Sequence, residues 1–324
     1  MSPTASSSRS KRASDLNLTV GDLLKEQSEH LKLELVTGEK SLKRPIAVSE
    51  LNRPGLALSG FLEHFRAERI QIIGNGEQSY CLKAPPKQLE AALASMLSSP
   101  DLPCLVLTHN LKTPPALAQA CKKNGVPLLR SNMDTAVVVG ELSAFLEERL
   151  AETTKVHGVL VDIYGLGVLI QGDAGIGKSE CALELLKRGH ILVADDVVEI
   201  QHRRGGVLRG FCPEPLKHYM EVRGLGVIDV KLLFGIGSIL DRTRIELAIQ
   251  LEPWNASTHY ERVGLETKHT SILGVEVPIL RIPVSPGRNL AVLIEVAALN
   301  QRLRSQGYFA AETFNRKLIE RMRA

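Results

Sequence analysis

Residues 172–179 read Gly172-Asp173-Ala174-Gly175-Ile176-Gly177-Lys178-Ser179, and this stretch decides the fold. It matches the Walker A pattern G-x-x-x-x-G-K-[ST], in which glycines let the backbone curl so that N–H groups point inward at phosphate oxygens. The apolar run Val168-Leu169-Ile170 precedes the loop, and a helical pattern from Lys178 to Arg188 follows it. A strand, a glycine-rich loop and a helix in this order predict a nucleotide-phosphate site at a helix N-terminus.

Two side chains of this loop carry chemistry. Lys178 is predicted to reach the β- and γ-phosphates, and the Ser179 hydroxyl to bind Mg²⁺, which keeps most of its shell as water and phosphate oxygen. P-loop enzymes also need a carboxylate at the end of a neighbouring strand, and Asp195 and Asp196 directly follow the apolar run 191–194. Such a carboxylate can hold Mg²⁺ through water or act as general base towards an attacking hydroxyl. The alternative for the pair is a strand-end turn with two solvated aspartates.

Composition and charge narrow the class of protein. The chain has 324 residues, 44% hydrophobic and 23% charged, with a formal net charge of +4. This length favours two domains, and the charge is too mild to predict nucleic-acid binding. No apolar stretch reaches the roughly 18–20 residues of a membrane helix. Five widely spaced cysteines without a C-x-x-C pair argue against a zinc site or a redox dithiol. We therefore expect a cytoplasmic protein with reduced thiols and with no nucleic-acid or membrane partner.

The pattern along the chain predicts an α/β fold in three parts. Residues 1–14 are expected to form a disordered leader, residues 15–150 an N-terminal α/β domain with a partly parallel sheet, and residues 151–324 a P-loop catalytic domain with a mixed β-sheet and C-terminal helices. The predicted helices are 20 towards 33, 87–96, 115–123, 141–155, 178–188, 290–305 and 310–322. The predicted strands are 70–73, 104–107, 126–129, 156–161, 167–171, 191–194, 197–201, 207–211, 245–251 and 279–284.

Other segments in the second half are weaker signals when taken singly. His157 begins a predicted strand, and the glycine-rich run 220–229 places a carboxylate and an arginine close together. In the run 283–288, Gly287 permits a close backbone approach and Arg288 offers planar, multi-donor phosphate contacts. Each of these features is a weak signal alone: a single His157 would more often be a structural histidine, and a single Arg262 a surface charge.

Together, however, these segments resemble the bacterial HPr kinase/phosphorylase family. The matching segments are His157-Gly158-Val159-Leu160-Val161, the loop Gly172 to Ser179 with Glu180, Val193-Ala194-Asp195-Asp196, Glu221-Val222-Arg223-Gly224-Leu225-Gly226-Val227-Ile228-Asp229, Gly287-Arg288-Asn289-Leu290-Ala291 and Glu295-Val296-Ala297-Ala298-Leu299-Asn300. The resemblance covers the whole second half, whereas the first half matches in length and α/β style without a diagnostic motif. The family commonly has serine at Ala174 and valine at Ile176, and both positions donate only their backbone.

The resemblance implies a bifunctional serine protein kinase and phosphorylase. Such an enzyme transfers the γ-phosphoryl group of ATP, or a phosphoryl group of pyrophosphate, to a serine of HPr, the phosphocarrier of the sugar phosphotransferase system that serves carbohydrate metabolism. In the reverse direction, inorganic phosphate attacks phosphoserine and gives pyrophosphate. The family forms a homohexamer built through its catalytic domains.

Residue roles follow from the matched positions. The resemblance implies catalytic roles for His157, Lys178, Asp196 and Arg262, with Asp196 as the base that takes the serine proton and returns it in reverse. It implies Mg²⁺ ligation by Ser179 and Glu221. It implies a segment for both activities, Met220, Glu221, Val222, Arg223, Gly224, Leu225, Gly226, Val227, Ile228 and Asp229, and a dephosphorylation segment, Pro283, Val284, Ser285, Pro286, Gly287 and Arg288. Spacing from Lys178 favours Asp196 over Asp195 as the base, and the assignment between the two stays open.

Two other functions fit the loop. The first is a P-loop kinase or ATPase acting on a small molecule, such as a relative of phosphoenolpyruvate carboxykinase, although its metal-binding His and Lys set cannot be assembled here. The second is a nucleotide-sensing module without activity, against which the presence of Lys178, Ser179 and Asp196 argues. The effectors and the role of the first domain lie beyond what the sequence decides.

Overall fold

The computed structural model describes residues 18–255 and 267–323. The chain folds into two compact units, with the division between Ala151 and Glu152. The predicted leader, residues 1–14, lies outside the described residues. None of the described helices combines the length and the apolar character needed to cross a membrane.

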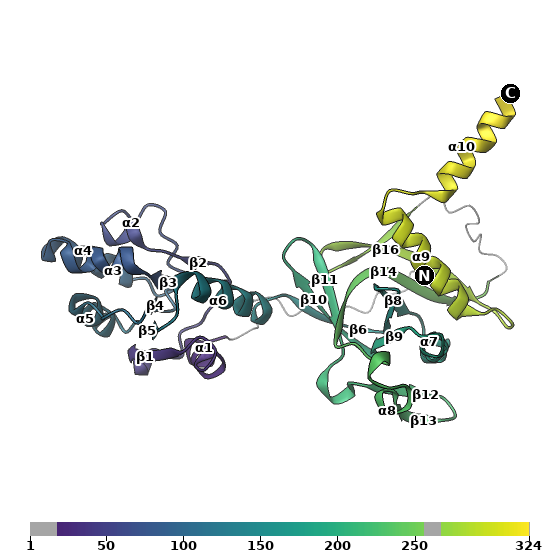
Figure 1. Ribbon diagram of the computed structural model, residues 1–324, viewed down its shortest axis with the longest axis horizontal. Helices are drawn as coiled ribbons and strands as arrows, with labels where there is room; N and C mark the ends of the chain where they lie inside the picture. The colour runs from purple at the N-terminus through teal and green to yellow at the C-terminus, as the bar shows by residue number, and fades with distance from the viewer. Residues whose placement is uncertain (1–17, 256–266, 324) are drawn as a thin grey trace, which may run out of the picture. The chain divides into compact units, whose positions relative to one another are not determined.

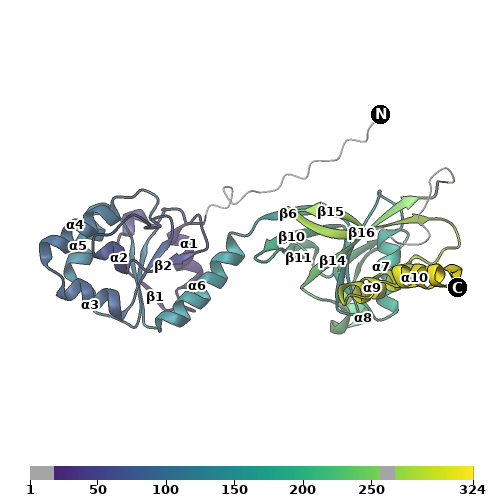
Figure 2. The ribbon, with the colours of Figure 1, turned by 90° about the horizontal axis from the view of Figure 1, so that it is seen from above.

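The N-terminal unit has three layers around a five-stranded sheet of order β1-β5-β4-β3-β2. Strands β2 to β5 run parallel, and β1 is antiparallel to β5. The partly parallel sheet is therefore confirmed. The strands are β1 (Leu33–Thr37), β2 (Leu51–Asn52), β3 (Ile70–Ile73), β4 (Leu105–Leu107) and β5 (Leu128–Ser131). The helices are α1 (Val20–Gln27), η2 (Glu39–Ser41), α2 (Gly55–Leu58), α3 (Asn75–Lys83), α4 (Pro86–Leu97), α5 (Pro115–Asn124) and α6 (Thr135–Arg149). One core lies under α1 and α6 and another under α3, α4 and α5, on opposite faces of the sheet (Figure 2).

Two helix predictions in this unit were wrong at their ends. The first helix ends at Gln27 rather than near Leu33, because residues 28–32 form turns, with Lys32 at a φ of 49°. Leu33 is the first residue of β1 and pairs with Ser131 of β5. The last helix was predicted to reach Lys155 but ends at Arg149. The residues that follow it form β6 (Thr153–His157), which is hydrogen-bonded to β10.

The C-terminal unit is built on a mixed sheet whose main path is β6-β10-β11-β14-β8-β7-β9, with β16 paired to β14 and β15 paired to β16. The strands are β6, β7 (Val159–Ile163), β8 (Leu166–Gln171), β9 (Ile191–Ala194), β10 (Val197–Arg203), β11 (Val207–Phe211), β12 (Tyr219–Val222), β13 (Gly226–Asp229), β14 (Arg242–Pro253), β15 (Lys268–Ile272) and β16 (Val275–Val284). The helices are α7 (Lys178–Lys187), η3 (Glu214–Leu216), α8 (Val230–Phe234), η4 (Ile236–Ser238), α9 (Leu290–Ser305) and α10 (Ala310–Arg323). The mixed sheet and both C-terminal helices confirm the predicted architecture, and α9 lies beside β8 and β14 (Figure 1).

Strand direction brings distant parts of this unit to one edge. Strands β8, β14 and β16 are parallel neighbours, so all three end at the same edge of the sheet. Strand β7 is antiparallel to both β8 and β9, so β9 also ends at this edge and β7 begins there. Side chains just after β8, β9 and β16, and just before β7, therefore lie along the same edge of the sheet.

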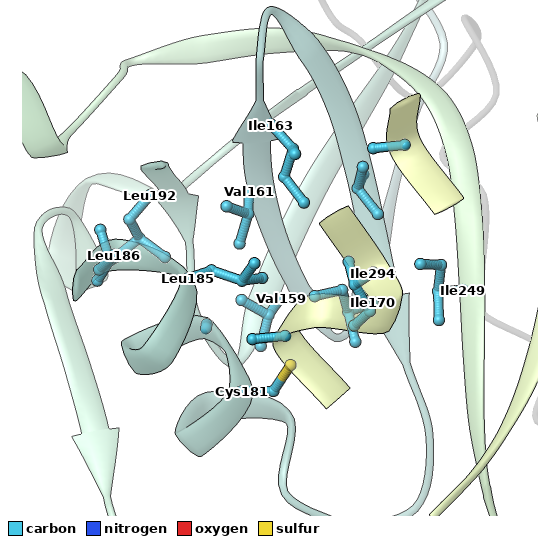
Figure 3. Packing of buried hydrophobic residues seen from close by; sticks show 14 of the residues in the cluster. Val159, Val161, Ile163, Ile170, Cys181, Leu185, Leu186, Leu192, Ile249 and Ile294 are labelled. Carbon is cyan, nitrogen blue, oxygen red and sulfur yellow. The ribbon is translucent and has the colours of Figure 1, made fainter. Parts of the chain in front are cut away.

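The core beneath this edge fixes helix α7 to the sheet. Leu185 of α7, at 0% exposure, packs in one cluster with Val159 of β7, Ile170 of β8 and Ile294 of α9 (Figure 3). At the far end of α7, the Arg188 guanidinium and His190 both contact the buried Glu295 carboxylate of α9, at 2.6 and 2.7 Å. The Arg188 guanidinium is the main reason that the pKa of Glu295 is lowered. Helix α7 is thus held by its buried face and just beyond its C-terminal end, which fixes its position against the sheet.

Replacing Leu185 tests how strongly this core holds α7. Leu185→Ala removes a fully buried side chain and should lower the free energy of unfolding by about 2–5 kcal/mol. Leu232→Ala, at a side chain that is 82% exposed, should change it by less than about 0.5 kcal/mol. Urea unfolding followed by far-UV circular dichroism measures both. Equal losses in the two variants would contradict this packing.

Candidate active site

The glycine-rich loop runs from the end of β8 to the first turn of α7. Gly177 is the N-cap of α7 with a φ of 103°, a left-handed conformation that glycine adopts without strain. The Lys178 side chain is buried, at 8% exposure, and its Nζ donates to the carbonyl oxygens of Gly172 and Asp173 at 2.9 and 3.0 Å. The ammonium group is thus held under the loop, where the N-terminus of α7 adds further positive potential.

Asp195 lies at the end of β9 and links three elements. Its Oδ1 accepts a hydrogen bond from the Ser179 hydroxyl at 2.9 Å, and its Oδ2 accepts one from the Glu221 backbone N–H at 3.1 Å. The residue is only 3% exposed. Burial raises the pKa of Asp195, and the hydrogen bonds from Ser179 and Glu221 oppose that rise. Asp195 therefore connects the loop helix with the hairpin β12–β13.

Asp196, the next residue, has a contrasting environment. Its φ is 68°, and Val197 N–H donates to Asp195 O at 2.9 Å across it, which is the hydrogen bond of a γ-turn with positive φ. Such backbone strain clusters at functional sites. The Asp196 side chain is 58% exposed, and its Oδ1 lies 3.3 Å from His157 Nε2. The turn thus presents the Asp196 carboxylate to solvent beside a histidine.

The segment 220–229 forms the hairpin β12–β13 beside the loop. Met220 and Val222 are buried in the core that α7 shares, while Glu221 and Arg223 between and after them are exposed. The backbone bond to Asp195 brings Glu221 to the same carboxylate as Ser179. Arg223 lies against Gly175 of the loop, because a β-carbon built at Gly175 would meet the Arg223 guanidinium.

The segment 283–288 reaches the same edge of the sheet. It follows β16 and is tied to the end of β14 by a bond from Trp254 N–H to Val284 O at 3.2 Å. Arg288 Nη1 donates to Pro283 O at 3.4 Å within this turn. Among the residues that the structure describes, no hydrogen bond joins Arg288 to the phosphate loop. Arg262 lies outside the described residues.

The side-chain oxygens beside the loop could supply a few of the ligands of a hard divalent cation such as Mg²⁺, but not a full coordination shell. Within the described residues, no group of three or more His, Cys, Asp or Glu is placed to hold a metal ion. Mg²⁺ needs no such cage, because it takes one or two protein oxygens and completes its shell with water and phosphate. The Ser179 hydroxyl and the Asp195 carboxylate oxygen, 2.9 Å apart beside the loop, fit that requirement.

Sequence reasoning found most of these residues but left two relations unseen. It named Asp195 as one of two candidate carboxylates without finding that Asp195 accepts hydrogen bonds from both Ser179 and Glu221. It also quoted Arg223 without placing it against Gly175. The glycine that follows Arg223 is typical of a tight turn between two strands, but no sequence signal places that turn against the loop.

These features define the second unit as a P-loop nucleotide-binding domain with carboxylates at the end of a neighbouring strand. Comparison with known families shows to which family of P-loop proteins the chain belongs. The model of the HPr Serine kinase C-terminal domain matches residues 148–318, and that of the HPr Serine kinase N terminus matches residues 18–146. The chain belongs to the HPr serine kinase family.

Two individual relatives are similar in sequence over most of the chain. It is 47% identical to the HPr kinase/phosphorylase of Bacillus licheniformis over 296 residues, which cover 91% of this chain and 95% of that protein. Identity to the protein of the same name from Bacillus subtilis is 46% over 296 residues, with the same coverage of 91% and 95%. A solved structure titled Hpr(Ser) kinase/phosphatase from Coxiella burnetii is 37% identical over 49% of this chain and 97% of that chain, with a TM-score of 0.45.

Cys181, two residues after the loop serine, is a core residue rather than a reactive one. It is 5% exposed, and burial raises the pKa of its thiol to about 12. Figure 3 shows it among the apolar side chains beneath α7. This agrees with the interpretation of the chain's cysteines as reduced thiols, since all five are free and buried.

A thiol reagent tests this assignment. Between pH 7 and 9 the native protein should react with an aromatic disulfide reagent at least about tenfold more slowly than the chain unfolded in guanidinium, where a thiol has a pKa of about 8.5. Absorbance of the released thiolate gives both rates. A fast phase in the native protein that peptide mapping assigns to Cys181 would show that its thiol is accessible.

Proposed function

We propose that this chain transfers a phosphoryl group from ATP or pyrophosphate to a serine hydroxyl of HPr, and that it also catalyses attack of inorganic phosphate on phosphoserine-HPr. Membership of the HPr serine kinase family and the names of the relatives support this activity. The observation that carries the proposal is the division between two neighbouring aspartates. Asp195 is buried and engaged by Ser179, while Asp196 is exposed on a strained turn at the same edge of the sheet.

In the proposed forward reaction, each of these residues has a distinct role. The serine oxygen of HPr forms a bond to the γ-phosphorus, the bond from that phosphorus to the β,γ-bridging oxygen breaks, and ADP leaves with the electron pair. Asp196 takes the serine proton, and His157, 3.3 Å from it, holds that carboxylate in position. Lys178 and the N–H groups of the loop neutralise charge on the transferred group. We assign Arg262 a supporting role on the family resemblance alone.

The proposed reverse reaction uses the same protein residues. An oxygen of inorganic phosphate attacks the phosphoserine phosphorus, the bond to the serine oxygen breaks, and Asp196 returns the proton to that oxygen as pyrophosphate forms. The incoming phosphate needs a second anion site near the loop. The segment 283–288 ends at the correct edge of the sheet, and Arg288 supplies a guanidinium for it.

We further propose that Mg²⁺ binds at Ser179 with Glu221 and the Asp195 carboxylate nearby. When bound there, it would neutralise charge on the phosphate groups of the nucleotide. We also propose a homohexamer assembled through the catalytic domains and a cytoplasmic location. Family resemblance supports the assembly, as do apolar side chains exposed on α9, among them Val296 and Leu299.

Mass spectrometry of HPr tests the function and the shared site together. Incubation of HPr with the wild-type chain and ATP–Mg²⁺ should add one phosphoryl group to a serine, and phosphate should remove it with release of pyrophosphate. Lys178→Ala should abolish both reactions, with a loss of at least about 10²-fold in each, because both need a phosphoryl group held by the same ammonium.

The matched control is Lys187→Ala, which removes an exposed lysine at the other end of α7 and should leave both rates within about twofold. Phosphorylation of a small molecule without any mass shift of HPr would refute the proposed substrate. Phosphorolysis that survives in Lys178→Ala would refute a shared site.

Arg288→Ala tests the second anion site. It should lower the rate of phosphorolysis by about 10-fold or more and change the kinase rate by less than about threefold, because only the reverse reaction brings in free phosphate. Arg281→Ala, at an exposed arginine of β16, is the control. Initial rates of phosphorolysis over a range of phosphate concentrations give the first quantity, and initial rates of HPr phosphorylation with ATP–Mg²⁺ give the second. An equal loss of the two activities in Arg288→Ala would contradict a selective role.

A further inference from the structure

The hairpin β12–β13 carries an arginine to the phosphate loop on a rigid support. Val222, Arg223, Gly224 and Leu225 form a β-turn closed by Leu225 N–H to Val222 O at 3.0 Å, with Gly224 at a φ of 84° in the third position. This is the arrangement of a type II turn, which fixes the backbone of Arg223. Met220 and Val222 are buried in the core that α7 shares, so the base of the hairpin cannot shift independently of the loop helix.

A second contact fixes the position of the hairpin relative to the loop. Glu221 N–H donates to Asp195 Oδ2 at 3.1 Å, while the Ser179 hydroxyl donates to the other oxygen of the same carboxylate at 2.9 Å. One buried side chain therefore positions both the start of α7 and the strand that leads into Arg223.

The guanidinium of Arg223 lies directly against the loop backbone. A β-carbon at Gly175 would be 2.5 Å from Nη2, 2.7 Å from Nη1 and 2.8 Å from Cζ of Arg223. These distances are too short for any real side chain, so residue 175 must be glycine for the guanidinium to reach this place. The φ of Gly175, 79°, imposes the same requirement independently.

The charge of Arg223 has no counter-ion in the described part of the chain. Arg223 is exposed and makes no ion pair or hydrogen bond with any described residue, although a guanidinium has five N–H donors. Its surroundings carry the Lys178 ammonium and the positive end of α7, together with Asp173 of the loop and Glu221 of the hairpin, neither of which forms an ion pair with it. A nucleotide phosphate in the loop would supply the anionic partner that this guanidinium lacks among the described residues.

We infer that Arg223 is a phosphate-binding residue, which closes the loop over the phosphoryl group in transfer. This inference rests on the proposed function and names a residue for it. Gly175 is the fourth residue of the loop whose N–H groups surround the β- and γ-phosphates, so the guanidinium lies beside the group that moves. Lys178 neutralises that group from the buried side and Arg223 from the exposed side. A planar guanidinium can bind two phosphate oxygens at once.

The test compares Arg223→Gln, Arg223→Lys and the control Lys187→Gln in the full chain. Arg223→Gln should lower kcat for HPr phosphorylation and for phosphorolysis by about 10²-fold or more, and Arg223→Lys should recover part of the loss. The dissociation constant of Mg–ADP should stay within about threefold, since ADP has no transferred group. The urea midpoint should not change, and Lys187→Gln should behave like the wild type.

A second readout does not depend on HPr. Tetrafluoroaluminate with Mg–ADP mimics the phosphoryl group in transfer, and calorimetry should show that Arg223→Gln weakens this complex by about 10-fold or more while ADP alone binds normally. Near-wild-type kcat and near-wild-type affinity for the mimic in Arg223→Gln would overturn the inference. Equal weakening of ADP and the mimic would overturn it too, because it would show that Arg223 only supports the loop. If the wild type fails to phosphorylate HPr but the mimic result holds, the proposed substrate is wrong and the role of Arg223 stands.

Discussion

The buried carboxylate of Asp195 is the contact on which the rest of the site depends. It is the common acceptor for the Ser179 hydroxyl and the Glu221 backbone N–H, so it fixes the loop helix, the end of β9 and the hairpin β12–β13 relative to one another. Burial raises the pKa of Asp195 above that of an exposed aspartate. An acid whose pKa is higher in the folded state favours folding most at low pH and loses that contribution as the pH rises through the folded pKa. The ionised form of this group therefore costs stability, which its two hydrogen bonds partly offset.

Strand direction explains why segments far apart in the sequence reach the edge of the sheet where this carboxylate lies. The loop, the two aspartates and the segment 283–288 each follow strands that end at one edge, and His157 precedes the strand that begins there. A single antiparallel strand, β7, lies between β8 and β9 and makes this possible, because two reversals restore the original direction. The sheet thus collects groups for acid–base work and for phosphate binding without a long functional loop among the described residues.

How much of this could be predicted depended on whether the signal was local. The strand, loop and helix around Gly172–Ser179 were predictable because glycine spacing and the apolar run lie within one short stretch. The different environments of Asp195 and Asp196 could not be predicted. They depend on which carboxylate accepts the hydrogen bond from Ser179 and on a γ-turn that exposes the other one. The turn after the first helix and the start of β1 at Leu33 were missed because no glycine or proline marks the end of that helix, and the strand is defined by its pairing with β5. Arg223 was missed as a loop contact because it comes from a hairpin whose position only the tertiary fold determines.

The contrast between the two aspartates also bears on reversibility. A group that must take a proton in one direction and return it in the other needs access to the reacting oxygen and a partner that does not trap the proton. Asp196 has both, since it is exposed and its contact is with a solvent-facing histidine, whereas Asp195 is already committed to two donors. Neither reaction direction is favoured by that geometry alone. In the proposed mechanism the balance between them depends on what occupies the second anion site, which we assign to the segment 283–288, and on the surface around the loop, which includes the hairpin β12–β13.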